Sequence, residues 1–358
     1  MRILIVKTSS LGDVIHTLPA LTDACQAIPG LQADWVVEEA FVEIPALHPS
    51  VGRVIPVSIR RWRREGSGSL FADEFRRFRS DLKSEKYDLI IDAQGLIKSA
   101  LISWQGRGPR VGLDRKSIKE KVSCLFYNRT ITVPKSMHAV WRVRQLFAAA
   151  LGYNFDAESI DYGIRPAKRE TDDSSPALMF LHGTTWSSKH WPLPYWRELA
   201  RLAGEHDFRV DLPWGNLAEQ ERALAIAEHQ PHVRVLERAG LSELAAQIAG
   251  CAGVVAVDTG LGHLAAAFNC PTVSIYGATD TALTGTFGHN QLHLKSDLPC
   301  APCLKRECHY KGQLLSDSTA LDGEFRVEPP CYRSSPPAEV MRHLTRLMEQ
   351  SASMEPAL

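Results

Sequence analysis

The strongest constraint on the fold is an alternation of short apolar runs with stretches of helical periodicity. The chain opens with the apolar run 3–6, which is typical of a strand buried on both faces of a parallel sheet. A polar turn at 7–13 follows, and apolar residues then recur at helical spacing from 14 to 25. The start of the chain therefore predicts one strand, one loop and one helix.

The same alternation continues in two blocks. In the first block, strands are expected at 34–37, 54–57, 89–91 and 130–133, and helices at 71–82 and 138–151. In the second block, strands are expected at 178–181, 208–212, 233–236, 253–257 and 272–276, and helices from Pro194, at 217–229 and at 242–249. The segment 154–176 is polar and lacks a sustained period, as in a linker. The pattern predicts an α/β fold with two domains, 1–153 and 177–335, followed by an amphipathic helix at 336–358.

Composition excludes several classes of protein. The 358 residues include 41 basic and 41 acidic side chains, so no net charge favours nucleic acid. No apolar stretch reaches the roughly eighteen residues of a membrane span, and no signal peptide is expected at the N-terminus. Neither block contains the glycine fingerprint of a nicotinamide enzyme or of a P-loop ATPase. These observations predict a cytoplasmic protein.

Chemically active residues follow the predicted strands, at the edge where open parallel sheets bind ligands. In the first loop, Asp13 can act as a general base or simply cap the next helix, and both readings stay open. The turn Asp258-Thr-Gly-Leu-Gly-His263 opens a helix whose backbone amides can bind a diphosphate; a tight turn with a capping aspartate is the alternative. The loop Gly183-Thr-Thr-Trp-Ser-Ser-Lys189 ends in a lysine that either binds phosphate or is a solvated surface residue.

Two further clusters stand outside these loops. A basic run at 60–64 places four arginines around one tryptophan; such a run is usually a solvated face, and it can also grip carboxylates bidentately. The second cluster, a possible structural zinc site or a set of free thiols, contains Cys300, Cys303, Cys308 and Cys331.

Six motifs follow one another along residues 1–288. They are Lys7-Thr-Ser-Ser-Leu-Gly-Asp13, Arg60-Arg-Trp-Arg-Arg64, Asp92-Ala-Gln-Gly-Leu96, Lys189-His-Trp-Pro192, Leu212-Pro-Trp-Gly215 and Val257-Asp-Thr-Gly-Leu-Gly-His263. In this order they resemble the bacterial heptosyltransferases of glycosyltransferase family nine, in particular those that add the first heptose to the Kdo sugar acids of lipopolysaccharide. The resemblance implies the glycosyltransferase B architecture, two Rossmann-like domains face to face with a central cleft. It places the acceptor in 1–153, ADP-heptose in 177–335, and the last helix across the domain junction.

The resemblance also implies roles for individual residues. Those expected to bind the donor are Thr184, Thr185, Lys189, Trp214, Glu219, Asp258, Thr259, Gly260, Leu261, Gly262 and His263. Those expected to bind the acceptor are Ser9, Ser10, Gly12, Arg60, Arg61, Arg63, Arg64 and Lys119. Asp13 would be the catalytic base, and Lys189 would stabilise the departing ADP in place of a metal ion.

The expected activity is inverting transfer of heptose from ADP-heptose to Kdo-lipid A, without a cofactor. The enzyme would act as a monomer in peripheral contact with the cytoplasmic face of the inner membrane, and it would not bind nucleic acid. Three other functions remain open at this point. They are addition of the next core heptose, a nucleotide-sugar epimerase with its own acid/base pair, and a zinc-stapled binding module without catalysis.

Overall fold

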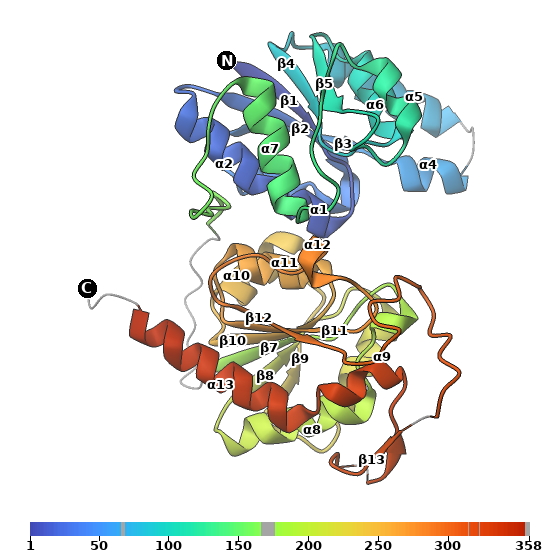
Figure 1. Ribbon diagram of the computed structural model, residues 1–358, viewed down its shortest axis with the longest axis vertical. Helices are drawn as coiled ribbons and strands as arrows, with labels where there is room; N and C mark the ends of the chain where they lie inside the picture. The colour runs from blue at the N-terminus through green and yellow to red at the C-terminus, as the bar shows by residue number, and fades with distance from the viewer. Residues whose placement is uncertain (66–68, 166–175, 314, 322, 355–358) are drawn as a thin grey trace. The chain divides into compact units, whose positions relative to one another are not determined.

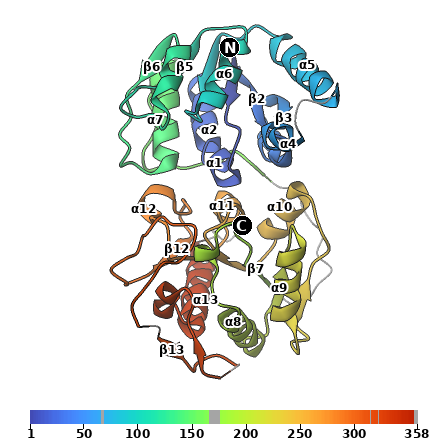
Figure 2. The same cartoon turned by 90° about the vertical axis from the view of Figure 1, so that its right-hand side faces the viewer.

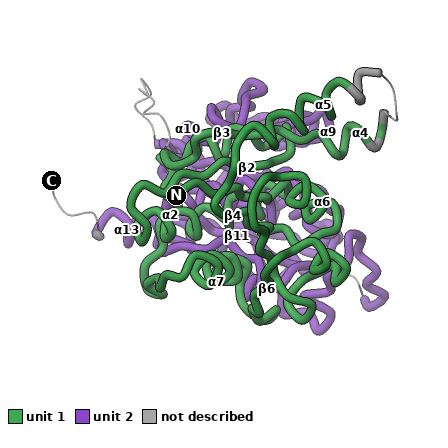
Figure 3. Tube along the Cα trace, turned by 90° about the horizontal axis from the view of Figure 1, so that it is seen from above, with its two compact units in different colours: residues 1–165 green, residues 166–358 purple. Residues whose placement is uncertain are grey.

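The structure is a computed structural model that describes residues 1–65, 69–165, 176–313, 315–321 and 323–354, without the side chains at 63, 65, 69–72 and 354. The chain divides into two compact units, unit 1 (Met1–Arg165) and unit 2 (Pro166–Leu358), which Figure 3 colours separately. No helix in the described ranges is long and apolar enough to cross a membrane.

Unit 1 is built on a six-stranded parallel sheet with the Rossmann-like order β3-β2-β1-β4-β5-β6. The strands are β1 (Arg2–Val6), β2 (Gln32–Glu38), β3 (Val51–Val57), β4 (Leu89–Asp92), β5 (Arg110–Leu113) and β6 (Arg129–Ile131). The α-helices are α1 (Leu11–Ile15), α2 (Leu18–Ala27), α3 (Glu43–Ala46), α4 (Ile59–Glu65), α5 (Ser69–Lys83), α6 (Ile97–Gln105) and α7 (Ala139–Leu151), and the short 3-10 helices include η2 (Lys121–Phe126). α2 and α7 pack side by side (Figure 1), while Phe78 of α5 and Ile102 of α6 pack with Leu4 and Val6 of β1.

Unit 2 repeats this architecture, with the order β12-β11-β10-β7-β8-β9. Its strands are β7 (Ala177–Leu181), β8 (Arg209–Leu212), β9 (Val233–Val235), β10 (Gly253–Val257), β11 (Thr272–Tyr276) and β12 (Gln291–Lys295), and β13 (Ser316–Asp317) pairs separately with β14 (Phe325–Arg326). The α-helices are α8 (Leu193–Glu205), α9 (Leu217–Ala227), α10 (Leu241–Ala249), α11 (Gly260–Ala267), α12 (Thr281–Thr284) and α13 (Pro337–Met354). α13 packs on α8 (Figure 2) and also contacts β10, β11 and β12.

The structure confirms the α/β class and the two Rossmann-like units. One expectation is wrong, because the helix expected at 14–25 is two helices, α1 and α2. Pro19 lies in the first turn of α2, where its missing N–H is tolerated; inside a continuous helix it would have removed a hydrogen bond. The unit 1 sheet also contains β5 and is partly covered by α6, and the unit 2 sheet also contains β12; none of the three was expected from the sequence.

The expected linker, 154–176, is only partly a connection. Residues 154–165 belong to unit 1, where Tyr162 and Ile164 are buried, and residues 166–175 lie outside the described ranges. The central cleft and the packing of the last helix across the domain junction stay predictions.

Candidate active site

The loop after β1 carries Asp13 at the carboxyl edge of the unit 1 sheet. β1 and β4 are neighbours at the point where the strand order reverses, the usual ligand-binding position in such sheets. The backbone N–H and the hydroxyl of Ser10 donate hydrogen bonds to Asp13 Oδ2 at 2.9 and 3.0 Å. Asp13 Oδ1 lies 3.3 Å from Lys7 Nζ, and 41% of the Asp13 side chain is exposed. Asp13 therefore caps α1, as one reading predicted, and it still presents an accessible carboxylate to a ligand.

Lys7 controls the charge of this carboxylate. Burial alone would raise the pKa of Asp13, but the Lys7 ammonium and the hydrogen bonds from Ser10 outweigh burial and hold that pKa below its usual value. Lys7 is itself buried and donates a hydrogen bond to the Ala93 carbonyl oxygen at 3.0 Å. Asp13 is therefore ionised at neutral pH, as a general base must be.

The loop after β4 holds the first loop in place. Gln94 Oε1 accepts hydrogen bonds from the backbone N–H groups of Thr8 and Ser9 at 3.0 and 3.1 Å. The buried Asp92 carboxylate in turn accepts bonds from the backbone N–H groups of Gln94 and Gly95 at 2.9 and 3.0 Å. The Asp92-Ala-Gln-Gly-Leu96 motif thus positions the loop that carries Asp13, a role that the sequence alone did not reveal.

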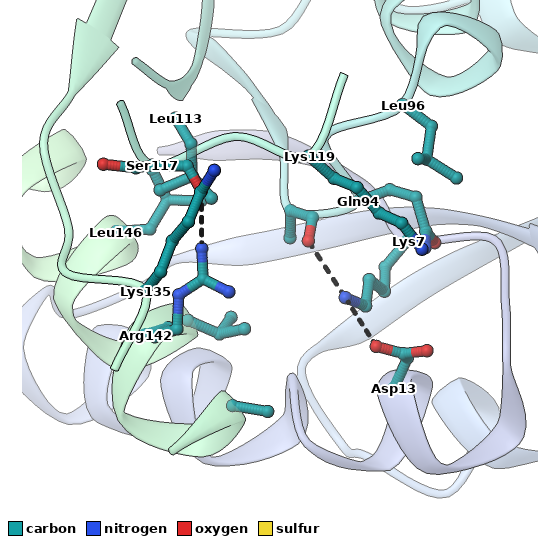
Figure 4. A pocket seen from close by; sticks show the side chains of 13 residues that line it. Lys7, Asp13, Gln94, Leu96, Leu113, Ser117, Lys119, Lys135, Arg142 and Leu146 are labelled. Atoms are coloured by element: carbon teal, nitrogen blue, oxygen red, sulfur yellow. Dashed lines mark hydrogen bonds and ion pairs between the residues drawn. The ribbon is translucent and has the colours of Figure 1, made fainter. Parts of the chain in front are cut away.

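These two loops border a pocket of about 470 Å³ inside unit 1 (Figure 4). Its charged lining consists of one carboxylate, Asp13, and the cations Lys7, Lys119, Lys135 and Arg142. Lys135 and Arg142 lie on one side of the pocket, apart from the Lys7–Asp13 pair (Figure 4). Because Lys7 is paired with Asp13, three cations remain for a ligand, and the pocket suits an acidic molecule that carries a hydroxyl group.

Arg142 lines this pocket and carries one buried N–H group without an acceptor in the described part of the chain. Its NH2 group donates a hydrogen bond to the Ser117 carbonyl oxygen at 2.7 Å. Its Nε is buried and has no acceptor among the described residues. Burial lowers the pKa of Arg142, although the guanidinium stays charged at neutral pH. Neither Lys135 nor Arg142 stood in a motif that could have revealed it.

The basic run at 60–64 forms α4, whose described side chains do not line this pocket. Arg61 already has carboxylate partners, because its NH2 lies 3.1 Å from Glu39 Oε2 and 3.0 Å from Glu74 Oε2. Arg60 and Arg64 are exposed, and the side chain of Arg63 lies outside the described part of the chain. A role for this run in binding the acceptor stays a prediction. Of the other expected acceptor residues, Lys119 lines the pocket, whereas Gly12 is buried in α1.

In unit 2 the loop after β7 brings Lys189 against Asp258, the residue that follows β10. Lys189 Nζ lies 2.7 Å from Asp258 Oδ2, and the two side chains are only 14% and 11% exposed. Lys189 Nζ is also 4.3 Å from the centre of the Trp186 ring, and Thr184 Oγ1 donates a hydrogen bond to the Asp258 carbonyl oxygen at 2.9 Å. Thr185 of the same loop is exposed. Asp258 thus positions Lys189, a contact that the sequence analysis did not foresee.

The turn after β10 is the N-terminus of α11. Thr259 is its N-cap, and Gly260 and Leu261 are partly exposed in the first turn, where backbone amides can bind a diphosphate. Gly262 and His263 are buried instead. A Cβ on Gly262 would lie 3.3 Å from the Cβ of Ala256, so this glycine allows α11 to pack closely on β10.

Trp214 and Glu219 lie beyond the end of β8, the strand next to β7. Trp214 Nε1 donates a hydrogen bond to the Leu236 carbonyl oxygen at 2.8 Å, and Glu219 Oε2 accepts one from the Gly215 N–H at 2.8 Å. A Cβ on Gly183 would lie 2.8 Å from Glu219 Cδ, so the glutamate touches the loop after β7. Trp214 and Glu219 therefore lie at the same edge of the sheet as the loop that carries Lys189. A nucleotide is larger than a diphosphate, so its site needs residues from more than one strand end.

The four clustered cysteines line one small pocket in unit 2. All four are free thiols, and burial together with the neighbouring cysteines raises the pKa of Cys331 to about 12. Within the described ranges, no group of three or more His, Cys, Asp or Glu side chains is arranged to hold a metal ion. A structural zinc site and a set of free thiols both stay predictions for this cluster.

Comparisons with known proteins agree with this geometry. Residues 75–314 match glycosyltransferase family 9 (heptosyltransferase). The chain is 52% identical over 350 residues to lipopolysaccharide heptosyltransferase 1 of Pseudomonas aeruginosa, covering 97% of this chain and 98% of that protein. It is 48% identical over 295 residues to the Escherichia coli K12 protein of the same name, covering 82% and 92%. The solved structure of E. coli heptosyltransferase WaaC with ADP-2-deoxy-2-fluoro heptose matches with a TM-score of 0.77 and 46% identity over 83% of this chain and 93% of that one. The chain therefore belongs to glycosyltransferase family 9, the heptosyltransferases.

Proposed function

We propose that the protein transfers heptose from ADP-heptose to a Kdo sugar of Kdo-lipid A, with inversion at the anomeric carbon and without a cofactor. The observation that carries this proposal is the ionised Asp13 carboxylate at the edge of a pocket whose remaining charged residues are cations. Kdo is a sugar acid, so its carboxylate fits the cations and its hydroxyl fits the aspartate. The names of the similar proteins, and the ADP-sugar analogue bound to WaaC, support the same donor and reaction.

In unit 1, Asp13 acts as the general base. A Kdo hydroxyl gives its proton to the Asp13 carboxylate while its oxygen attacks the anomeric carbon of the heptose. The Kdo carboxylate binds the guanidinium of Arg142 together with Lys135 and Lys119. Lys7 keeps the base ionised until the proton is transferred.

In unit 2, Lys189 stabilises the leaving group. The bond between the anomeric carbon and the diphosphate oxygen breaks, and its electron pair leaves with ADP. The Lys189 ammonium and the first amides of α11 neutralise the charge that builds on the diphosphate, a task that a metal ion performs in other transferases. Trp214 and Glu219 bind the adenosine, and the new glycosidic bond forms on the face opposite to the departing ADP.

The direct test is to mix the protein with ADP-heptose and Kdo-lipid A and to measure ADP release and the mass of the lipid. Release of ADP together with a gain of one heptose supports the proposal. Use only of an acceptor that already carries a heptose would instead identify the enzyme that adds the next heptose. Conversion of the donor without any acceptor would indicate an epimerase.

Because the acceptor is anchored in the membrane by its lipid, we also propose that the protein works at the cytoplasmic face of the inner membrane.

A further inference from the structure

Unit 1 exposes five large apolar side chains on two elements that pack against each other, α6 and η2. They are Ile97, Leu101 and Trp104 of α6 and Val122 and Leu125 of η2, with Trp104 59% and Leu125 77% exposed. We call these five residues the α6–η2 patch. Grouped exposed apolar residues of this size mark an interaction surface more often than single ones do.

On each of the two elements, the exposed apolar residues lie on one side. On α6 they follow one another at spacings of four and three, which places them on one side of an α-helix. On η2 the spacing is three, which places both residues on one side of a 3-10 helix. The opposite side of α6 is buried through Ala100 and Ile102. Both elements therefore bury one side in unit 1 and present an apolar side to their surroundings.

Basic residues border the patch. The segment between β5 and η2, together with the start of η2, exposes the cations Arg115, Lys116, Lys119 and Lys121, and none of these forms an ion pair within the described ranges. The two nearby acids are already engaged. Asp114 accepts hydrogen bonds from the backbone N–H groups of Lys116 and Ser117, and Glu120 accepts one from that of Ile97. An exposed tryptophan beside leucines and unpaired cations is the chemistry of a surface that binds anionic lipid.

We propose that the α6–η2 patch docks unit 1 on an anionic lipid bilayer. Lys119 belongs both to the basic border and to the lining of the pocket beside Asp13, and Leu96 of that lining directly precedes Ile97. Docking through this patch brings the pocket to the bilayer surface, where a sugar acid anchored by acyl chains projects. The benefit of docking, access to a lipid-anchored acceptor, rests on the proposed function. The choice of a lipid bilayer as the partner rests only on the exposed apolar and basic residues.

Vesicle binding tests the proposal directly. Wild-type protein should sediment with vesicles of phosphatidylethanolamine and phosphatidylglycerol, more weakly at high salt and more weakly with phosphatidylcholine alone. The double variant Trp104→Ser/Leu125→Ser should lose about tenfold in binding, because two apolar anchors are removed. The matched control is Leu217→Ser/Leu224→Ser on α9 of unit 2, where the residues are 72% and 56% exposed. The control should bind as the wild type does. Equal binding by the patch variant, or no binding by the wild type, would overturn the proposal.

A second measurement separates docking from the chemistry. The patch variant should lose turnover on Kdo-lipid A in vesicles and keep wild-type turnover on a water-soluble Kdo acceptor without acyl chains. Equal loss on both acceptors would mean that the patch supports the active site rather than the bilayer, and would overturn docking. If the wild type used neither acceptor, the proposed function would fail, while vesicle binding would still decide the docking surface.

Discussion

Asp13 combines a structural role with a proposed chemical one, and a conservative substitution separates them. Asp13→Asn keeps an oxygen that can accept the hydrogen bond from the Ser10 N–H, so α1 should stay capped. The amide cannot accept the proton of the Kdo hydroxyl, so kcat should fall by on the order of 10²–10⁴ while the Kd of ADP stays unchanged. Steady-state kinetics and calorimetry measure the two quantities. Near wild-type kcat with an intact fold would show that Asp13 is a helix cap only.

Lys7 should determine the pH range in which Asp13 works. Lys7→Met keeps the length of the side chain and removes the charge that lowers the pKa of Asp13, so burial then raises that pKa. The acid limb of the kcat/KM profile should move to higher pH. The free energy of unfolding should also depend on pH. In the wild type, the depressed pKa of Asp13 stabilises the folded state at pH values above the pKa of this group in the unfolded state. This contribution is lost as the pH falls through the pKa of Asp13 in the folded state. An unchanged pH profile in Lys7→Met would contradict this account.

Lys189 and Asp258 form an ion pair, so a substitution of either side chain changes the net charge that the diphosphate meets. Lys189→Ala removes the cation that faces the diphosphate and should lower kcat by about 10²–10³. It also leaves the Asp258 carboxylate beside an anionic ligand without its cation, with the Thr279 hydroxyl still donating a hydrogen bond to it. The double variant Lys189→Ala/Asp258→Asn should therefore bind ADP more tightly than Lys189→Ala alone, although kcat stays low. If calorimetry showed the double variant binding ADP no better than the single one, Asp258 would not act through charge.

The contact between the loop after β7 and α9 depends on Gly183, which has no side chain and lets Glu219 approach the loop. A methyl group on Gly183 would meet the end of the Glu219 side chain, which can move without disturbing the fold. Gly183→Ala should therefore keep the wild-type Tm and weaken ADP binding about tenfold, because Glu219 loses its position. Gly152→Ala makes the matched comparison. Gly152 ends α7 at φ +81, so alanine there should cost about 1 kcal/mol of stability and leave ADP binding unchanged. A lowered Tm in Gly183→Ala without weaker ADP binding would refute this role.

Helices and strands were predictable where local pattern and burial agree. β1 and β10 are continuous apolar runs because both faces of each strand are covered, and the end of α7 at Gly152 follows from the left-handed backbone there. β5 was missed because a four-residue strand with arginine and glycine carries little apolar signal. The first helix was misread because its apolar spacing continues across Pro19, although the backbone hydrogen bonding cannot.

The pairings that build the site could not be predicted, because they join residues from distant parts of the chain. Lys189 was a candidate from its loop, but its partner Asp258 arrives from another strand of the same sheet. The basic run at 60–64 stood out in the sequence, yet the fold supplies Arg61 with Glu39 and Glu74. Arg142 belongs to no sequence motif, and only the fold shows that it lines the pocket beside Asp13. Sequence patterns located the loops, whereas tertiary contacts decide which charges remain for substrates.

The division of the substrates between the two units makes a prediction for the whole chain. Arg142 lies in unit 1 and Glu219 lies in unit 2. Arg142→Met should weaken binding of the Kdo acceptor about tenfold and leave the Kd of ADP unchanged, because a charge-assisted bond is lost only at the acceptor. Glu219→Gln should weaken the binding of ADP and leave the binding of the Kdo acceptor unchanged.

In the double variant Arg142→Met/Glu219→Gln, the loss of binding free energy for each substrate should equal the loss in the corresponding single variant within about 0.5 kcal/mol, as for independent sites. Calorimetry on the full chain, with ADP and a water-soluble Kdo acceptor titrated separately, measures each term. If Arg142→Met weakened ADP binding alone, the assignment of acceptor to unit 1 and donor to unit 2 would be wrong. A coupling well above that limit would mean that the two substrates share one binding surface, and the base and the leaving-group cation would then have to be sought within it.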